Sequence, residues 1–169
     1  DTYSTGNYPR RVIVGDVDND DRLDVMIANR DSHDLSIFIG YGNGSFQSQK
    51  KHFAGFTPNA IAMGDFNNDS NLDLVVPNVN SSEISVLYGY GNGSFQPRVR
   101  YSVGSRPVDV AVADLNDDQI LDIMIANYGS HSVSVLLGYG NGSFHDQLTF
   151  SVGSHPFSIA VGDFDRDRK

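Results

Sequence analysis

The sequence contains no cysteine, so it has no disulfide framework, no thiolate metal site and no cysteine nucleophile. It also lacks any apolar run near the ~20 residues that a transmembrane helix requires, which predicts no membrane insertion. Positive charge is scarce, because 12 Lys and Arg residues face 21 Asp and Glu residues and leave a net charge of −9. This acidity argues against nucleic acid as a partner.

Glutamate is almost absent as well, since Glu83 is the only glutamate among the acidic residues. Glutamate is a better helix former than aspartate, whereas aspartate combined with 17 glycines is typical of loops and turns. The composition therefore predicts a chain of strands and turns.

A 49-residue repeat organises the whole chain. The string GYGNGSF occurs at residues 40–46, 89–95 and 138–144, without insertions or deletions between copies. Other residues keep the same offset: Pro9, Pro58, Pro107 and Pro156; Asp16, Asp65, Asp114 and Asp163; Asn29, Asn78 and Asn127. The 169 residues thus form about three and a half copies of one unit, with no linker between them.

One unit reads as four antiparallel strands. Apolar residues alternate over residues 108–112, 121–125, 133–137 and 148–152, with the period of two that strands show. The Asn-Gly pair of the repeated string favours a hairpin turn over a phosphate-binding glycine loop, because no helix follows it. Four strands in ~40–50 residues are typical of one β-propeller blade, and a solenoid is the weaker alternative.

These units predict an all-β fold, a single β-propeller region over residues 1–169. Residues 1–8 end a preceding blade, residues 9–57, 58–106 and 107–155 are complete blades, and residues 156–169 begin another. The two partial blades do not complement each other, which suggests a fragment of a larger, about seven-bladed propeller. Residues 3–6 and 157–161 are expected to be unpaired strands that invite further blades of the same polypeptide, or self-association.

The alternation also predicts the core between blades. We expect the apolar residues of the first strands to be buried, and the leucine that follows each acidic loop to be buried beneath it. The first group is Val12, Val14, Ile61, Met63, Val110 and Val112, and the second is Leu23, Leu72 and Leu121.

Each unit carries an acidic loop of nine positions whose alternate side chains hold oxygen. Such side chains converge in a tight loop, and with one backbone carbonyl they supply the hard oxygens that Ca²⁺ prefers. Turn capping alone does not predict carboxylates at positions 1, 5 and 9 of every complete loop. The predicted ligands are Asp16, Asp18, Asp20, Asp24, Asp65, Asn67, Asp69, Asp73, Asp114, Asn116, Asp118 and Asp122, with backbone carbonyls of Arg22, Asn71 and Ile120, and Asp163, Asp165 and Asp167 of a truncated fourth loop.

Position 6 of these loops requires a sharp turn. Calcium loops usually place glycine there, but this chain has Asp21, Ser70 and Gln119. Because glutamine tolerates a left-handed backbone less well than aspartate, we expect the third loop to be the most strained. A strand rather than a helix follows each loop, which argues against a helical calcium sensor.

With these residues in view, the units resemble FG-GAP repeats, also described as VCBS-type repeats, which build the β-propellers of integrin α-chains and of many secreted proteins. The resemblance rests on the acidic loops, the preceding Gly-Asp, the Leu-Asp pair at positions 8 and 9, and Gly-Asn-Gly-Ser-Phe. It implies calcium between the first and second strands, on the face opposite the usual ligand-binding face. It also implies an extracellular location.

No constellation predicts catalysis or a further cofactor. The five histidines lack the short spacing of a zinc site, and no nucleophile elbow occurs. The main hypothesis is therefore a non-enzymatic extracellular module that binds a protein or glycan through loops 29–34, 78–83 and 127–132 and loops 55–58, 104–107 and 153–156. The alternatives are a structural building block of an extracellular assembly, or a scaffold attached to a catalytic part elsewhere.

Overall fold

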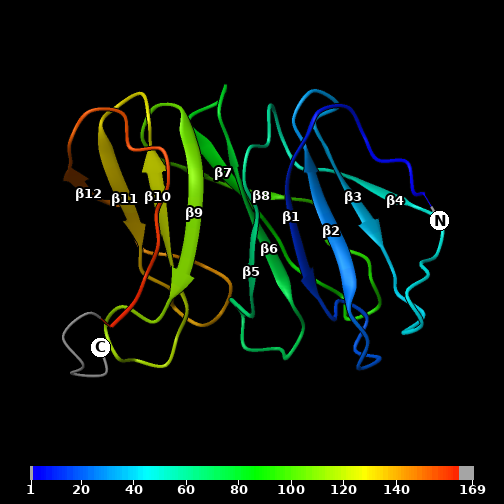
Figure 1. Cartoon of the computed structure of the whole chain (residues 1–169). Coiled ribbons are helices and arrows are strands. Elements are labelled where there is room, and N and C mark those ends of the chain that lie inside the picture. The colour runs from blue at the N-terminus through cyan, green and yellow to red at the C-terminus, as the bar shows by residue number, and fades with distance from the viewer. Residues whose placement is uncertain (1, 164–169) are drawn as a thin grey trace.

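The computed structural model describes residues 2–163, and these residues form an all-β chain. Twelve strands make three separate four-stranded antiparallel sheets that lie side by side (Figure 1). Nothing in the described range forms a helix long and apolar enough to cross a membrane. The prediction of four-stranded antiparallel units is confirmed.

Each sheet takes its four strands in chain order. The first sheet contains β1 (Pro9–Gly15), β2 (Asp24–Asn29), β3 (Asp34–Phe38) and β4 (Lys50–Phe53). The second contains β5 (Ala62–Gly64), β6 (Asp73–Asn78), β7 (Glu83–Leu87) and β8 (Val99–Ser102). The third contains β9 (Pro107–Ala113), β10 (Asp122–Asn127), β11 (Ser132–Leu136) and β12 (Leu148–Ser151).

One strand departs from the repeat. β5 has three residues, whereas β1 and β9 have seven. The register of β5 against β6 places Ala60 opposite Pro77, and a proline has no amide hydrogen to donate to a neighbouring strand. The equivalent positions in the other two sheets are Ala28 and Ala126, which pair with Arg11 and Asp109, so the first strands of these sheets pair over a longer stretch.

The core lies between the sheets. Alternate residues of the middle sheet face opposite sides, so β6 is buried along its whole length. One cluster joins the first sheet to the second and includes Met26, Leu35, Ile37, Ile61, Leu74 and Leu87. The other cluster joins the second sheet to the third and includes Phe66, Val75, Ile84, Ile123, Ile125 and Leu136.

The predicted core is only partly confirmed. Ile61 and Val110 are buried, and Met63, Leu72, Val112 and Leu121 are partly buried against the two clusters. The prediction was wrong for Val12, Val14 and Leu23, which are 57%, 48% and 65% exposed. These three residues face the outer side of the first sheet, and no sheet among the described residues packs on that side.

An aromatic pair crosses each of the two junctions, and a third pair joins the segment before β1 to the first sheet. The ring of Tyr3 meets Phe46 with centroids 5.4 Å apart, and the pairs one and two repeats later are His52 with Phe95 at 6.1 Å and Tyr101 with Phe144 at 5.2 Å. In each pair the first ring precedes a sheet or lies on its fourth strand, and the phenylalanine belongs to the hairpin string of the next sheet.

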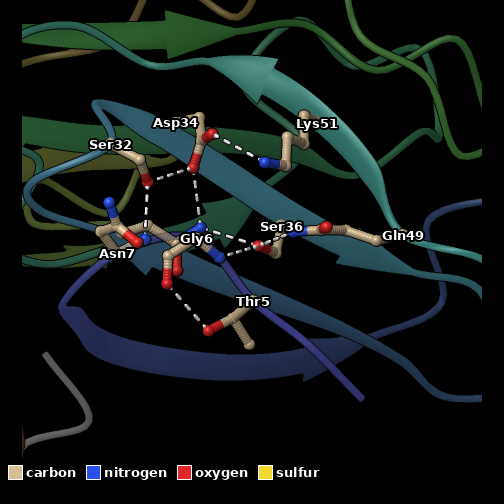
Figure 2. A network of polar contacts seen from close by, with 9 residues as sticks. Thr5, Gly6, Asn7, Ser32, Asp34, Ser36, Gln49 and Lys51 are labelled. Carbon is tan, nitrogen blue, oxygen red and sulfur yellow. Dashed lines mark hydrogen bonds and ion pairs between the residues drawn. The ribbon is translucent and has the colours of Figure 1, made fainter.

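The segment before β1 is held by hydrogen bonds rather than by strand pairing. The amide of Gly6 donates to Ser36 Oγ at 3.3 Å, and that of Asn7 donates to Ser32 Oγ at 3.0 Å (Figure 2). Residues 3–6 and 157–161 pair with no strand among the described residues, and that they lead to further blades or to self-association stays a prediction.

Candidate metal centres

The three complete acidic loops share one backbone shape. Positions 4 and 6 of each loop have left-handed backbones with φ between 56° and 66°, although none of these residues is glycine. They are Asn19, Asp21, Asn68, Ser70, Asp117 and Gln119. The sharp turn predicted at position 6 is therefore present in every loop, including the one that carries glutamine.

The carboxylate at position 1 organises this turn. Asp16 accepts the amides of Asp20 and Asp21 at 3.1 and 2.7 Å. Asp65 and Asp114 accept the equivalent amides of their own loops, with shorter contacts of 2.8 and 2.7 Å to position 6. Desolvation opposes ionisation of Asp114, but these backbone amides outweigh it and lower its pKa.

The carboxylate at position 9 has a different environment. Asp24, Asp73 and Asp122 are fully buried, and both oxygens of each accept backbone amides. For Asp122 the donors are Leu115 at 2.9 Å and Gly138 at 2.9 Å, which ties the loop to the hairpin after β11. These aspartates therefore stabilise the fold through these hydrogen bonds, independently of any ion that their remaining lone pairs bind.

The first loop brings carboxylates together most closely. Oxygens of Asp16, Asp18 and Asp24 lie within 4.8 Å of one another, and Asp18 Oδ1 is buried without a hydrogen-bond partner among the described residues. Burial raises the pKa of Asp18, and the carboxylates of Asp24, Asp20 and Asp16 raise it further. A cation at this place would satisfy the unpartnered oxygen and relieve the repulsion.

The second and third loops have one carboxylate fewer at positions 1, 3, 5 and 9. Asn67 and Asn116 replace the aspartate at position 3, and their amide groups donate to Asp69 at 3.0 Å and Asp118 at 2.9 Å. Burial is the main cause that raises the pKa of Asp73 to about 6. The donor set still consists of carboxylate and amide oxygens, which suits a hard cation.

The residues at position 7 differ from loop to loop. The guanidinium of Arg22 lies 3.3 Å from Asp20, and Asn71 Oδ1 accepts a 2.9 Å hydrogen bond from Asn19 of the previous loop. The sequence did not predict this contact between loops.

In the fourth loop Asp163 is exposed, and Asp165 and Asp167 lie outside the described residues.

The strand ends opposite the acidic loops form a second edge of the molecule, and this edge contains the two sets of loops expected to bind a partner. Antiparallel connectivity places the loops after β2, β6 and β10 at the same edge as the segments before β1, β5 and β9. A repeated hydrogen bond joins them, from Arg30 N to Tyr8 O, from Val79 N to Thr57 O and from Tyr128 N to Arg106 O, at 3.0, 3.2 and 3.0 Å. This edge also holds arginines that the sequence did not single out, because they are far apart in the chain.

Comparison with known proteins identifies the repeat. A family model described as FG-GAP-like repeat matches residues 16–76 and 114–169, together more than half of the chain. No curated protein is significantly similar to this chain in sequence.

Two solved structures share the fold. A structure of BBS1N in complex with ARL6DN, soaked with lead, has a TM-score of 0.62 and 18% identity, over 97% of this chain and 49% of that one. The pore of the Photorhabdus luminescens Tc holotoxin has a TM-score of 0.51 and 16% identity, over 85% of this chain and 7% of that one. This chain therefore spans less than half the length of either.

Proposed function

Because this chain belongs to the FG-GAP-like repeat family, we propose that it is a calcium-binding part of a larger, about seven-bladed β-propeller. In this proposal the propeller is a non-enzymatic extracellular module for recognition or adhesion, and it binds a protein or a glycan at the edge opposite the acidic loops.

The observation that carries the calcium proposal is the first acidic loop. Three carboxylates meet there, and a buried oxygen of Asp18 has no donor among the described residues. The other two loops have the same backbone and oxygen at the same positions. The ion would be held by the carboxylates at positions 1 and 5, the side chain at position 3 and the backbone carbonyl at position 7. The buried carboxylate at position 9 would lie beneath the ion.

Support for a larger propeller comes from the outer faces of the first and third sheets. Val12 and Leu23 are exposed on one face, and Leu115 and Phe150 on the other, although their repeat equivalents at the two junctions pack into the core. Exposed apolar faces of this kind are typical of surfaces that contact another element. Further blades of the same fold would cover both.

Support for an extracellular, non-enzymatic role comes from the loops and from the histidines. Calcium sites in extracellular modules are weak, and loops without the usual glycine fit that range, since millimolar calcium keeps weak sites filled. His33 Nδ1 accepts the amide of Thr57 at 3.1 Å, and His131 Nδ1 accepts that of His155 at 3.0 Å. Both rings thus have a structural contact.

The test is calcium titration of the 169-residue chain by calorimetry, followed by thermal unfolding with calcium and with chelator. We expect three ions, each stabilising the fold by about 2.7 kcal/mol when free calcium is about 100-fold above Kd. Asp118→Ala removes a position 5 ligand, so two ions should remain. Asp146→Ala removes an exposed carboxylate of the same sheet outside the loops and should leave three. An unchanged unfolding midpoint in calcium would contradict the proposal.

A further inference from the structure

The edge opposite the acidic loops contains a cavity lined by repeat-equivalent positions. Arg10, Asn59, Val108 and Phe157 follow each other at the 49-residue offset, and all four line a cavity of about 190 Å³. Arg30 and Arg106 line it too. A second cavity of about 180 Å³ shares the same four positions and adds Arg11. Three sheets and the segment after β12 therefore contribute to one place, with a different residue from each repeat.

The arginines make cation–π contacts with aromatic rings. The guanidinium carbons of Arg10 and Arg30 each lie 5.8 Å from the ring centroid of Tyr8, and that of Arg106 lies 4.9 Å from the centroid of Tyr128. Such cation–π contacts orient a guanidinium while its N–H groups stay free to donate. Tyr8 and Arg106 have left-handed backbones, with φ of 54° and 52°, directly before a proline.

Within residues 2–163 these arginines form no ion pair with a carboxylate. The ion pairs within the described residues involve Arg22, Lys51, Arg98 and Arg100, and none of them lines the cavity. Asp109 borders the second cavity, and it accepts hydrogen bonds from Ser158 Oγ at 2.7 Å and Ile159 N at 3.1 Å. In a chain with a net charge of −9, three cations without an ion pair among the described residues thus lie at one place.

We propose that this cavity binds an acidic side chain of a protein segment, through hydrogen bonds from Arg10, Arg30 and Arg106 to its carboxylate. Arginine is the residue best suited to planar, bidentate recognition of a carboxylate. The cavity is smaller than the 300–1,000 Å³ of a typical small-molecule pocket, so it fits one charged group rather than a sugar ring stacked on an aromatic face. Tyr128, an aromatic residue of the lining, already has the guanidinium carbon of Arg106 4.9 Å from its ring centroid. This proposal rests on the recognition role proposed above and names its ligand class.

The test uses a fluorescein-labelled peptide of alternating Gly and Glu, with the matching Gly–Gln peptide as its neutral control, in fluorescence anisotropy with the calcium-loaded chain. We expect binding of the acidic peptide only, and weakening with rising salt. Arg30→Gln and Arg106→Gln should each weaken binding about tenfold, the effect of one charged hydrogen bond. Arg100→Gln is the matched control, because Arg100 is exposed on β8 and outside the cavity, and it should bind like the parent chain.

Three outcomes would overturn the proposal. The first is no binding of the acidic peptide by a chain that titrates with calcium, which would leave the calcium proposal intact. The second is equal loss in Arg30→Gln and Arg100→Gln, which would indicate nonspecific attraction. The third is binding of a sulfated oligosaccharide, but not of the peptide, that depends on Arg30 and Arg106. That result would leave a recognition role standing and assign the cavity to a glycan.

A second inference concerns the three identical hairpin turns. Asn43, Asn92 and Asn141 each precede glycine, and in each turn the Oδ1 atom accepts the backbone amide two residues later at 3.0 Å. The turns differ at that glycine. Gly93 N donates to Val17 O at 2.9 Å and Gly142 N donates to Phe66 O at 3.1 Å, both across a junction between sheets. Gly44 N has no partner among residues 2–163, and Gly44 is exposed.

We infer that Asn43 is a deamidation site and that Asn92 and Asn141 are protected. Once Gly44 N loses its proton to a base in solvent, it attacks Cγ of Asn43, a C–N bond forms and ammonia leaves. Water then opens the succinimide to aspartate or isoaspartate. At Gly93 and Gly142 the same nitrogen must first break its hydrogen bond to the neighbouring sheet.

Mass spectrometric peptide mapping after incubation at mildly alkaline pH tests this. Conversion of Asn92 and Asn141 should be at least about fivefold slower than that of Asn43, the factor that opening one hydrogen bond corresponds to. In urea the three rates should become equal, because the local sequence GYGNGSF is the same. Equal rates in the folded chain, or fastest conversion at Asn92, would overturn the inference.

Discussion

Phe66 in the second sheet and Leu115 in the third hold the same place in consecutive repeats, directly after the first residue of the acidic loop. Phe66 is 1% exposed and packs against Phe144 with ring centroids 5.8 Å apart. Leu115 is 39% exposed. The two positions have the same local structure, so the difference lies in what covers them: a neighbouring sheet in one case and solvent in the other.

The same comparison applies to the glycines that precede each first strand. A Cβ atom on Gly104 would lie 2.4 Å from Ser130 Oγ and 2.5 Å from Asn127 Cγ, because the segment passes close to the end of the third sheet. A Cβ atom on Gly153 would meet nothing within 4 Å. Repeat positions with identical residues can therefore have opposite energetic importance.

The largest expected effect is at the buried aromatic position. Phe66→Ala should lower the free energy of unfolding by about 3–5 kcal/mol, because it removes a fully buried ring and leaves a cavity between two sheets. Leu115→Ala should cost at most about 1 kcal/mol. Urea unfolding of both variants measures this. Similar losses would mean that the outer face of the third sheet is covered in solution.

The glycine pair should give the next largest effect. Gly104→Ala should destabilise the chain by about 1–3 kcal/mol, because the new methyl group overlaps Asn127 and Ser130. Gly153→Ala should be within about 0.5 kcal/mol of the parent chain. Comparison of the unfolding midpoints of the two variants measures this difference. A Gly104→Ala chain about as stable as the parent chain would show that Asn127 is free to move.

A smaller gain is expected at position 6 of the third loop. Gln119 has a φ of 66°, which glycine adopts without steric cost. Gln119→Gly should relieve that strain, although the unfolded state gains freedom, so we expect a net change of about 1 kcal/mol or less in favour of the fold. A matched substitution, Ser70→Gly, tests whether the strain is specific to glutamine. Destabilisation by Gln119→Gly in calcium-free buffer would contradict the strain.

The smallest effect concerns pH and separates the two junctions. Burial lowers the pKa of His52 from 6.5, and its equivalent at the second junction is Tyr101. The folded state therefore favours neutral His52, so its contribution to stability is complete above pH 6.5 and is lost as pH falls through the lowered pKa. His52→Tyr should reduce the loss of stability between neutral and mildly acidic pH. Identical pH profiles for parent and variant would assign that loss to the other histidines.

Much of this molecule could be predicted from the repeat. Apart from the shorter β5, the strands of each unit lie within about two residues of the alternating segments, because a period of two fixes which residues share a face. The short β5 could have been anticipated from Pro77, which interrupts pairing where the other repeats have alanine. The left-handed position 6 was likewise predicted from the loop pattern of Ca²⁺ sites.

The sequence by itself determined the strand pattern, the hairpins and the acidic loops, because each depends on residues close together in the chain. Only the tertiary structure decided that Val12 and Leu23 are exposed while Ile61 is buried, since burial depends on a neighbouring sheet. The tertiary structure alone brought Arg10, Arg30 and Arg106 around one cavity. It also gave Gly93 N and Gly142 N a hydrogen bond that Gly44 N does not make to any described residue. A repeat specifies the same local structure each time, whereas packing between its copies gives each residue its own environment.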